Sequence, residues 1–312
     1  MRAIEYDTFG GPEVLTLVEV PVPEPGPSQV RVAVKIAAVN GIDWKIREGH
    51  LGEQPMPQRP GVELAGVVDA AGPDAAVAVG DEVFGWAAAA ATQVQGWDGG
   101  FPAGAYADYA LAEVAIPKPA ELTWTQAAAL PVAGETALRG VGQLDVAAGE
   151  VLLILGGSGV VGSIAVQLAV ARGATVIATA GDANADYVAA LGATPVRYGD
   201  GLVQRVRDIS PRVDAALDAA GLGGLEDLVS LRGGTDRIVS LADPAAFELG
   251  FPFDPGGPGD HNTGVLTELA ELAVSGALHI RHSRSYPLPE AAQAQQFSAT
   301  GHASGKITLD VG

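Results

Sequence analysis

Residues 151–162 constrain the fold of this chain more than any other segment. They begin with five apolar residues, Val-Leu-Leu-Ile-Leu, which are typical of a buried parallel strand. A glycine cluster follows, and residues 163–173 are typical of a helix that ends at a C-terminal glycine. The cluster contains the pattern G-x-G-x-x-G, formed by Gly157, Gly159 and Gly162.

This pattern predicts a dinucleotide-binding loop. The first glycine allows the tight turn, the second lets a pyrophosphate approach the backbone, and the third lets the helix pack on the strand. The phosphates would lie over the free N–H groups at the positive end of the helix dipole. The alternative is a glycine-rich turn without a ligand, but the strand before the loop and the helix after it favour the dinucleotide site.

Strands and helices alternate through the middle of the chain. The expected strands cover residues 151–155, 175–180, 194–198, 213–218 and 236–242, and the helices between them cover 160–172, 184–191, 201–208 and 223–231. This alternation predicts parallel βαβ units, and therefore an α/β fold with a doubly wound parallel sheet. A further helix is expected over 265–276 and a further strand over 277–281.

The first part of the chain has a different pattern, in which short strands are separated by turns rich in Gly and Pro. Strand patterns occur at 14–20, 29–35, 59–68, 79–85 and 104–110. Residues 87–105 form a long loop that holds Trp97 and Phe101, and loops of this length are typical of lids or disordered segments. Thr123 and Gln126 form a capping box at the next helix start. The tail, 305–311, is expected to return as a strand to the first lobe.

Composition narrows the class of protein. A chain of 312 residues exceeds one typical domain, so we expect two lobes. The net charge of −19 argues against a nucleic-acid partner, which usually requires a basic face. The sequence contains no Cys, which excludes disulfides, thiolate nucleophiles and cysteine zinc ligands. The charged N-terminus and the short apolar runs favour a soluble cytoplasmic protein without a membrane span.

Several further segments carry a family resemblance. They are GGPEVL at 10–15, NGIDW at 40–44, PGVELAGVV at 60–68, AAALP at 127–131 and GETA at 134–137. Together with the glycine motif, they resemble the medium-chain dehydrogenase/reductase superfamily, closest to its zinc-free quinone oxidoreductase (zeta-crystallin-like) branch. The resemblance covers nearly the whole chain. It implies a GroES-like β-barrel lobe over 1–118, completed by about 285–312, a Rossmann lobe over 119–284, and a homodimer.

The chain departs from the zinc-dependent members of that superfamily. Those enzymes have a His beside the Glu after the Pro-Gly turn, where this chain has Val62, and they have a ligand Cys near Asn40. The five histidines of the chain have no metal-ligand spacing with carboxylates. We therefore expect no metal, and we expect Glu63 to be a structural carboxylate that holds loops near the cofactor.

Without zinc, alcohol oxidation lacks its Lewis acid, whereas a quinone or enone accepts a hydride and delocalises the charge onto oxygen. The resemblance implies that the polar groups near the acceptor are Asn40, Asp43 and Lys45. Two alternatives stay open: Lys45 as a solvated surface lysine, and Asp43 as a helix N-cap. Trp44 stands where the branch often has a tyrosine near the acceptor, and we expect Tyr106 and Tyr109 to lie elsewhere.

The choice of nucleotide depends on the end of the second strand. Small residues there, Ala180 and Gly181, match the NADPH-dependent branch, whereas Asp182 and the lack of Lys, Arg or His from 173 to 196 favour NAD. Arg197 or Tyr198 could compensate. On the resemblance we favour NADP, with NAD as the alternative to which the local charges lean. The resemblance also implies cofactor contacts at Thr136, Gly157, Ser158, Gly159, Val160, Val161, Gly162, Thr179, Gly181, Tyr198, Ala219, Ala220, Leu241, Ala242, Phe253 and Lys306, for which the alternative at Lys306 is a surface lysine.

These features predict an oxidoreductase that uses NAD(P)H to reduce a quinone or an α,β-unsaturated carbonyl by direct, zinc-independent hydride transfer. One alternative is a reductase that tailors a secondary metabolite. The other is a non-catalytic nucleotide-binding or scaffold member of the same family.

Overall fold

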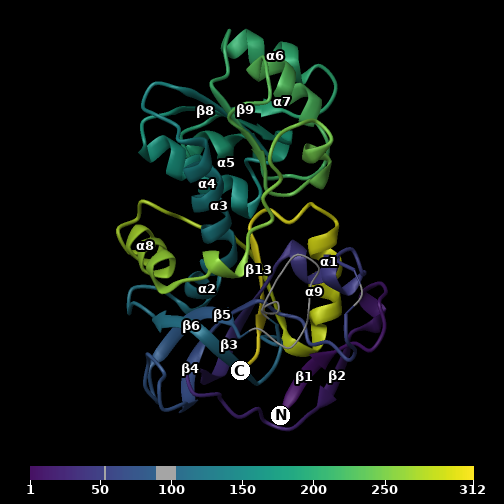
Figure 1. Cartoon of the computed structure of the whole chain (residues 1–312), viewed down its shortest axis with the longest axis vertical. Helices are drawn as coiled ribbons and strands as arrows, with labels where there is room; N and C mark the ends of the chain where they lie inside the picture. Colours follow the sequence, from purple (N-terminus) through teal and green to yellow (C-terminus); the bar gives the residue numbers. More distant parts are fainter. Residues whose placement is uncertain (53, 89–102) are drawn as a thin grey trace. The chain divides into compact units, whose positions relative to one another are not determined.

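The computed structural model describes residues 1–52, 54–88 and 103–312, which form two compact units (Figure 1). The first unit contains Met1–Val132, Gly257–Ser275 and Arg281–Gly312. The second contains Ala133–Gly256 and Gly276–Ile280. Trp97, Phe101 and most of the expected loop at 87–105 lie outside the described residues. No helix in the described part of the chain is long and apolar enough to cross a membrane.

The second unit is built on a parallel sheet with the strand order β11-β10-β7-β8-β9. Its strands are β7 (Val151–Leu155), β8 (Thr175–Ala180), β9 (Thr194–Arg197), β10 (Ala215–Asp218) and β11 (Ile238–Ser240). The connecting helices are α3 (Pro131–Leu144), α4 (Val160–Ala171), α5 (Ala185–Ala190), α6 (Leu202–Ile209) and α7 (Leu225–Arg232). This strand order confirms the doubly wound sheet. The chain adds β8 and β9 on one side of β7 and then β10 and β11 on its other side, so the strand order reverses between β7 and β10.

The central strand explains why this sheet forms. All five residues of β7 are buried, because β8 pairs on one side and β10 on the other while α4 packs against it. Buried apolar residues of the strands and helices form one core, which includes Leu153, Leu155, Ile177, Val206, Leu228 and Phe251. The strand-like run read from the sequence is therefore the centre of the unit.

The first unit contains a sheet in the order β12-β13-β3-β4-β5-β6. Its strands are β3 (Val30–Val39), β4 (Glu63–Ala71), β5 (Glu82–Ala87), β6 (Tyr109–Pro117), β12 (His282–Pro287) and β13 (Lys306–Asp310). Because β3 also pairs with β6, the strands β3 to β6 close into a barrel. In Figure 1 the C-terminal β13 lies beside the N-terminal β3, and their antiparallel pairing confirms that the tail returns to the first lobe.

Shorter elements complete the first unit. They are β1 (Arg2–Glu5), β2 (Thr16–Glu19), α1 (Gly41–Arg47), α2 (Trp124–Ala128), α8 (Thr263–Val274) and α9 (Ala291–Ala299), with 3-10 turns at Pro12–Val14, Pro258–Asp260 and Leu288–Glu290. Two more 3-10 turns, Asp182–Asn184 and Pro244–Phe247, belong to the second unit. The helix α8 packs against β6, and α9 packs against α1. Thr123 accepts from the Gln126 N–H, which confirms the expected capping box before α2.

Two local predictions are wrong. The strand expected over 277–281 does not form, and the strand in this region is β12, which pairs with β13. Because β12 is an edge strand in which only Tyr286 is buried, its polar sequence gives no apolar signal. Asp43 is not the N-cap of α1, because Asn40 takes that place and Asp43 lies in the first turn.

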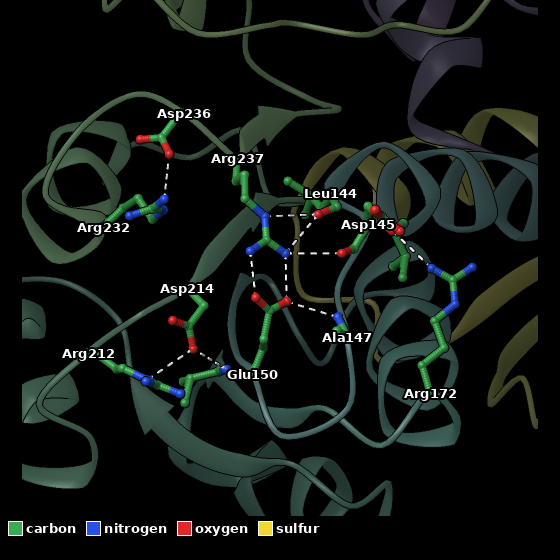
Figure 2. A network of polar contacts seen from close by, with 12 residues as sticks. Leu144, Asp145, Ala147, Glu150, Arg172, Arg212, Asp214, Arg232, Asp236 and Arg237 are labelled. Atoms are coloured by element: carbon green, nitrogen blue, oxygen red, sulfur yellow. Dashed lines mark hydrogen bonds and ion pairs between the residues drawn. The ribbon is translucent and has the colours of Figure 1, made fainter.

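An ion-pair network covers the amino ends of the parallel strands in the second unit (Figure 2). Arg237, just before β11, donates to both carboxylate oxygens of Glu150, just before β7, at 2.7 Å, and also to the Leu144 carbonyl. Asp214, just before β10, accepts from the Val151 N–H at 2.8 Å. This network ties strand starts together at the sheet edge opposite to the glycine loop, so its role is structural.

Candidate active site

The glycine loop follows β7 and is held by hydrogen bonds to β8. Gly156 has the left-handed φ of +81°, so the tight turn that the motif assigns to Gly157 falls one residue earlier. The Thr179 hydroxyl accepts from the Gly156 N–H at 2.8 Å, and its carbonyl accepts from the Gly157 N–H at 2.9 Å. Thr179, which the resemblance places at the cofactor, is 3% exposed and holds the glycine loop through these two hydrogen bonds.

The loop requires glycine for different reasons at different positions. A Cβ on Gly162 would lie 2.1 Å from the Gly156 carbonyl oxygen, and one on Gly157 would lie 2.6 Å from the Ala178 Cβ. A Cβ on Gly159 would meet only the Gly156 oxygen, at 3.3 Å, and would otherwise enter open space. Gly159 is the N-cap of α4 and has no side chain to cover the first amides of that helix. This open helix start, with Ser158, Val160 and Val161 around it, fits the pyrophosphate of a dinucleotide.

The loop after β10 lies against the glycine loop, at the point where the strand order of the sheet reverses. Asp218, at the end of β10, is fully buried and accepts from the N–H groups of Ala220 at 2.9 Å and Gly221 at 3.1 Å. The Ser240 hydroxyl, at the end of β11, donates to the same carboxylate at 2.7 Å. A Cβ on Gly156 would lie 3.0 Å from the Ala220 Cβ, so the two loops touch. The predicted cofactor residues Ala219, Ala220, Leu241 and Ala242 therefore lie at the same sheet edge as the glycine motif.

Two other predicted cofactor residues also belong to the second unit. Phe253 forms a parallel bridge with Ser240 and packs edge-to-face on Phe247 at 5.9 Å between ring centroids. This places Phe253 beside the end of β11. Thr136 lies in α3, and its hydroxyl donates to Glu135 at 3.3 Å.

Gly181, Asp182 and Tyr198 follow the neighbouring strands β8 and β9. The Asp182 carboxylate lies 3.4 Å from the Arg197 guanidinium, and both side chains are mostly exposed. Tyr198 is 63% exposed, and its hydroxyl lies 3.6 Å from where a Gly181 Cβ would be. Arg197, which could favour a 2′-phosphate, and Asp182, which would repel one, are therefore direct neighbours.

The first unit contains a buried polar cluster that the structure builds from four distant segments. Glu63 at the start of β4 is fully buried and accepts from the Lys306 ammonium at 2.5 Å, the Asn40 amide at 2.8 Å and the Val132 N–H at 2.7 Å. Lys306 also donates to the Asn40 amide oxygen at 2.6 Å. Both ends of the Asn40 amide are therefore fixed, and Glu63 has the structural role expected of it in joining segments.

Lys306 is 2% exposed, so the surface-lysine alternative is wrong. Its ammonium donates to Glu63 and Asn40 within the first unit. A lysine at the start of a strand gives no indication of this in the sequence, because the pairing depends on β13 lying beside β3.

Asp43 lies one turn beyond Asn40. The sequence predicts it as a polar group near the acceptor but does not predict its contacts. Its carboxylate accepts from the Asn40 N–H at 2.8 Å and from the Tyr106 hydroxyl at 2.9 Å, while its second oxygen has no partner among the described residues. Burial raises the pKa of Asp43 to about 6, although these two hydrogen bonds lower it. Burial and the Asp43 charge in turn raise the pKa of Tyr106 far above its ordinary value. Asp43 can therefore hold a proton up to about pH 6.

Tyr106 corrects an expectation, because it lies at Asp43 and not elsewhere. The two residues are 63 positions apart in the chain, so no local pattern links them. One sequence signal could have indicated the contact. Gly61, in the Pro-Gly turn of the family signature, has a φ of +105°, and a Cβ there would lie 2.5 Å from the Tyr106 ring. A glycine of this kind marks a close approach by another segment.

A small cavity of about 20 Å³ adjoins Asp43 in the same unit and has room for about one water molecule. Its lining includes Tyr6, Gln54 and Val62, and neither amide atom of Gln54 has a partner among the described residues. Lys45, the third residue predicted near the acceptor, is half-buried, with its ammonium 5.9 Å from the centre of the Trp44 ring.

The side chains that the structure describes do not fit a catalytic zinc site. In the described part of the chain, no group of three or more His, Cys, Asp or Glu residues could hold a metal ion. Val62 is buried beside Glu63, whose carboxylate is already bonded to Lys306, Asn40 and Val132.

Two family models match the chain. Residues 26–120 match the alcohol dehydrogenase GroES-like domain, and residues 183–309 match a domain described as zinc-binding dehydrogenase. A curated relative, the chloroplastic NADPH-dependent alkenal/one oxidoreductase of Arabidopsis thaliana, is 32% identical over 99% of this chain and 79% of its own. The chain belongs to the medium-chain dehydrogenase/reductase superfamily.

Solved structures place it in the quinone oxidoreductase (zeta-crystallin-like) branch of that superfamily. The quinone oxidoreductase from Coxiella burnetii is 33% identical, with a TM-score of 0.85 over 100% of this chain and 99% of that one. The Escherichia coli quinone oxidoreductase complexed with NADPH is 25% identical, with a TM-score of 0.86 over the whole of both chains. The predicted fold class and family are thereby confirmed.

Proposed function

We propose that this chain is an oxidoreductase that uses NADPH to reduce a quinone or an α,β-unsaturated carbonyl by direct hydride transfer without zinc. The observation that carries the proposal is the open glycine loop at the start of α4, in a chain of the quinone oxidoreductase branch. The Arabidopsis relative is named for NADPH and for alkenal/one substrates, and the Escherichia coli structure holds NADPH. A cytoplasmic location and a homodimer remain predictions.

The cofactor supplies the hydride when it is bound, so the protein has to bind, orient and stabilise charge. The backbone amides at the start of α4 bind the pyrophosphate, and Asp218 fixes the loop that touches Gly156. A quinone or enone that accepts a hydride develops negative charge on oxygen, and polar groups close to that oxygen stabilise it. We assign this role to Asn40 and Lys45, with Asn40 held rigid by Glu63 and Lys306, and we assign Asp43 a place beside them as a polar group that accepts from the Asn40 N–H.

The proposal is tested by following oxidation of NADPH and NADH with a panel of quinones and enones. We expect turnover with at least one acceptor and a higher rate with NADPH. Measurable dinucleotide binding without turnover on any acceptor would instead support a non-catalytic member of the family. A higher rate with NADH would overturn the choice of NADPH.

A glycine substitution connects the activity to the loop. Gly159→Ala places a methyl group at the open helix start while leaving the fold intact, because its Cβ meets only one atom, at 3.3 Å. Since charge-assisted hydrogen bonds to phosphate are lost, we expect binding weakened by roughly 10-fold or more. The matched control is Gly142→Ala in the exposed part of α3, where a Cβ meets nothing within 4 Å. Equal dinucleotide affinity in both variants, measured by titration calorimetry, would refute the assignment of this loop.

A further inference from the structure

A largely buried ion-pair network joins α3 to the segment that follows β11, within the second unit. The Arg139 guanidinium donates to Glu135 Oε1, one turn earlier in α3, at 2.6 Å, and to Asp254 Oδ1 at 2.6 Å. It also donates to the Asp254 carbonyl oxygen at 3.1 Å. Because the side chains of Arg139 and Glu135 are only 11% and 7% exposed, salt screens this network much less than a surface ion pair.

The helix α3 runs antiparallel to the strands of the sheet, so its first half lies toward the edge that carries the glycine loop. At the end of α3, the Leu144 carbonyl oxygen accepts from Arg237, just before β11. Closer to its start, a Cβ on Gly140 would lie 2.7 Å from a methyl carbon of Leu241, just after β11. Thr136 lies about one further turn toward the start of α3, and therefore beyond the carboxyl ends of the strands.

The segment after β11 is held at the same edge. The Ser240 N–H donates to the Pro252 carbonyl oxygen at 2.9 Å, and the Asp254 N–H donates to the Ser240 carbonyl oxygen at 2.8 Å. These two bonds fix the backbone on both sides of Phe253. The Asp254 carboxylate is held in turn by Arg139, so the ion-pair network sets the distance between this segment and α3.

Thr136 and Phe253 adjoin the network, one from each segment. The Thr136 hydroxyl donates to Glu135 Oε2 at 3.3 Å, and Phe253 directly precedes Asp254 in the chain. Both residues are half-buried, so part of each side chain is accessible to a ligand.

These two residues lie on the nicotinamide side of the predicted cofactor site. In a doubly wound sheet, a dinucleotide lies across the point where the strand order reverses, with its adenosine ribose at the end of the second strand. Since that strand is β8, and β10 and β11 lie on the other side of β7, the nicotinamide half extends toward β10 and β11.

We propose that Arg139 is a positioning residue for the nicotinamide half of the cofactor. It acts through Glu135 and Asp254, which fix Thr136 and Phe253 relative to each other, and not by touching the cofactor itself. The planar guanidinium suits this task, because it donates to two carboxylates at once in a fixed geometry. Hydride transfer requires the nicotinamide to be held in close to one orientation. This inference rests on the proposed function and adds a residue that supports it.

The test compares NADP⁺ with 2′-phospho-ADP-ribose, which lacks the nicotinamide. Titration calorimetry gives both dissociation constants without any substrate, and NAD⁺ with ADP-ribose replaces this pair if the wild-type protein binds NAD⁺ more tightly. Arg139→Gln should weaken NADP⁺ binding by roughly 10-fold and change 2′-phospho-ADP-ribose binding by less than about 2-fold. Arg139→Lys should resemble Arg139→Gln, since an ammonium keeps the charge but not the planar fork.

Arg237→Gln is the matched control, because it removes a comparable ion pair from the opposite edge of the same sheet (Figure 2). Arg237 donates to both carboxylate oxygens of Glu150 at 2.7 Å. A purely structural loss would affect both ligands alike in either variant. We expect Arg237→Gln to change both dissociation constants by less than about 2-fold.

The outcomes separate this inference from the proposed function. If the wild-type protein binds neither the dinucleotides nor their analogues, both are wrong. If it binds them, but Arg139→Gln weakens NADP⁺ and 2′-phospho-ADP-ribose by the same factor or no more than Arg237→Gln does, only the positioning inference is overturned.

Circular dichroism shows whether each variant is folded. If Arg139→Gln is not, Asp254→Asn decides the question, because it removes one charge of the network but keeps an oxygen that accepts from the Gly256 N–H. Asp254→Asn should weaken NADP⁺ binding by roughly 3-fold and leave 2′-phospho-ADP-ribose binding unchanged. Equal effects of Asp254→Asn on the two ligands would overturn the inference.

Discussion

The buried pair of Lys306 and Glu63 should be among the most sensitive points of the first unit. Their side chains are 2% and 0% exposed, and their charged atoms are 2.5 Å apart. At an effective dielectric constant of about 20, this separation corresponds to about 7 kcal/mol of gross attraction, most of which offsets the desolvation of the two ions. Removing one partner leaves a buried charge uncompensated, which costs about 3–5 kcal/mol.

We therefore expect Lys306→Met to lower the free energy of unfolding by about 3–5 kcal/mol, a large part of the stability of an ordinary domain. Adding Glu63→Gln removes the uncompensated charge but leaves one acceptor oxygen in place of two, so either the Asn40 amide or the Val132 N–H loses its acceptor. The double variant should therefore be about 2–3 kcal/mol less stable than the wild-type protein, because that N–H group loses its acceptor and the Asn40 amide oxygen loses its donor.

Urea unfolding followed by tryptophan fluorescence is the appropriate assay, because all four Trp residues of the sequence occur within Met1–Val132, in the first unit. Glu82→Gln is the matched control. Its carboxylate pairs with Lys118 but is 54% exposed, so we expect a loss below about 1 kcal/mol. The reasoning would be refuted if Lys306→Met cost no more than this control, or if the two single substitutions were additive in the double variant.

Three further predictions concern stability. Burial raises the pKa of Asp43 from 3.8 to about 6, so the folded state binds the proton more tightly than the unfolded state. The free energy of unfolding of the wild-type protein should therefore fall by about 3 kcal/mol as the pH rises from about 4 to 6. Urea titrations of Asp43→Asn should show no such fall. Hydrogen bonds from Arg237 lower the pKa of Glu150 from 4.5 to about 2. Arg237→Gln should therefore lower the free energy of unfolding by its full amount above about pH 4.5 and by less toward pH 2. Acid titration followed by circular dichroism would detect or exclude this trend. Gly142→Ala should raise the free energy of unfolding by about 0.5–1 kcal/mol in thermal melts, because an exposed helical glycine is replaced without a clash, and a lowered melting temperature would contradict this.

The sequence by itself determined the parallel sheet and its glycine loop. The apolar run of β7, the three motif glycines and the alternation of strands and helices are local patterns with a local physical cause. The absence of Cys and the presence of Val62 likewise need no structure to argue against a zinc site. In contrast, β12 was missed because an exposed edge strand has no apolar signal.

Only the tertiary structure decided which polar side chains meet. Lys306 reaches Glu63 and Asn40 because β13 pairs with β3, and Tyr106 reaches Asp43 across 63 residues. These contacts depend on strand pairing between distant segments, and a sequence pattern does not record the distance between two side chains in space. The raised pKa of Asp43 has the same origin, since burial is a property of the packed unit and not of the residue.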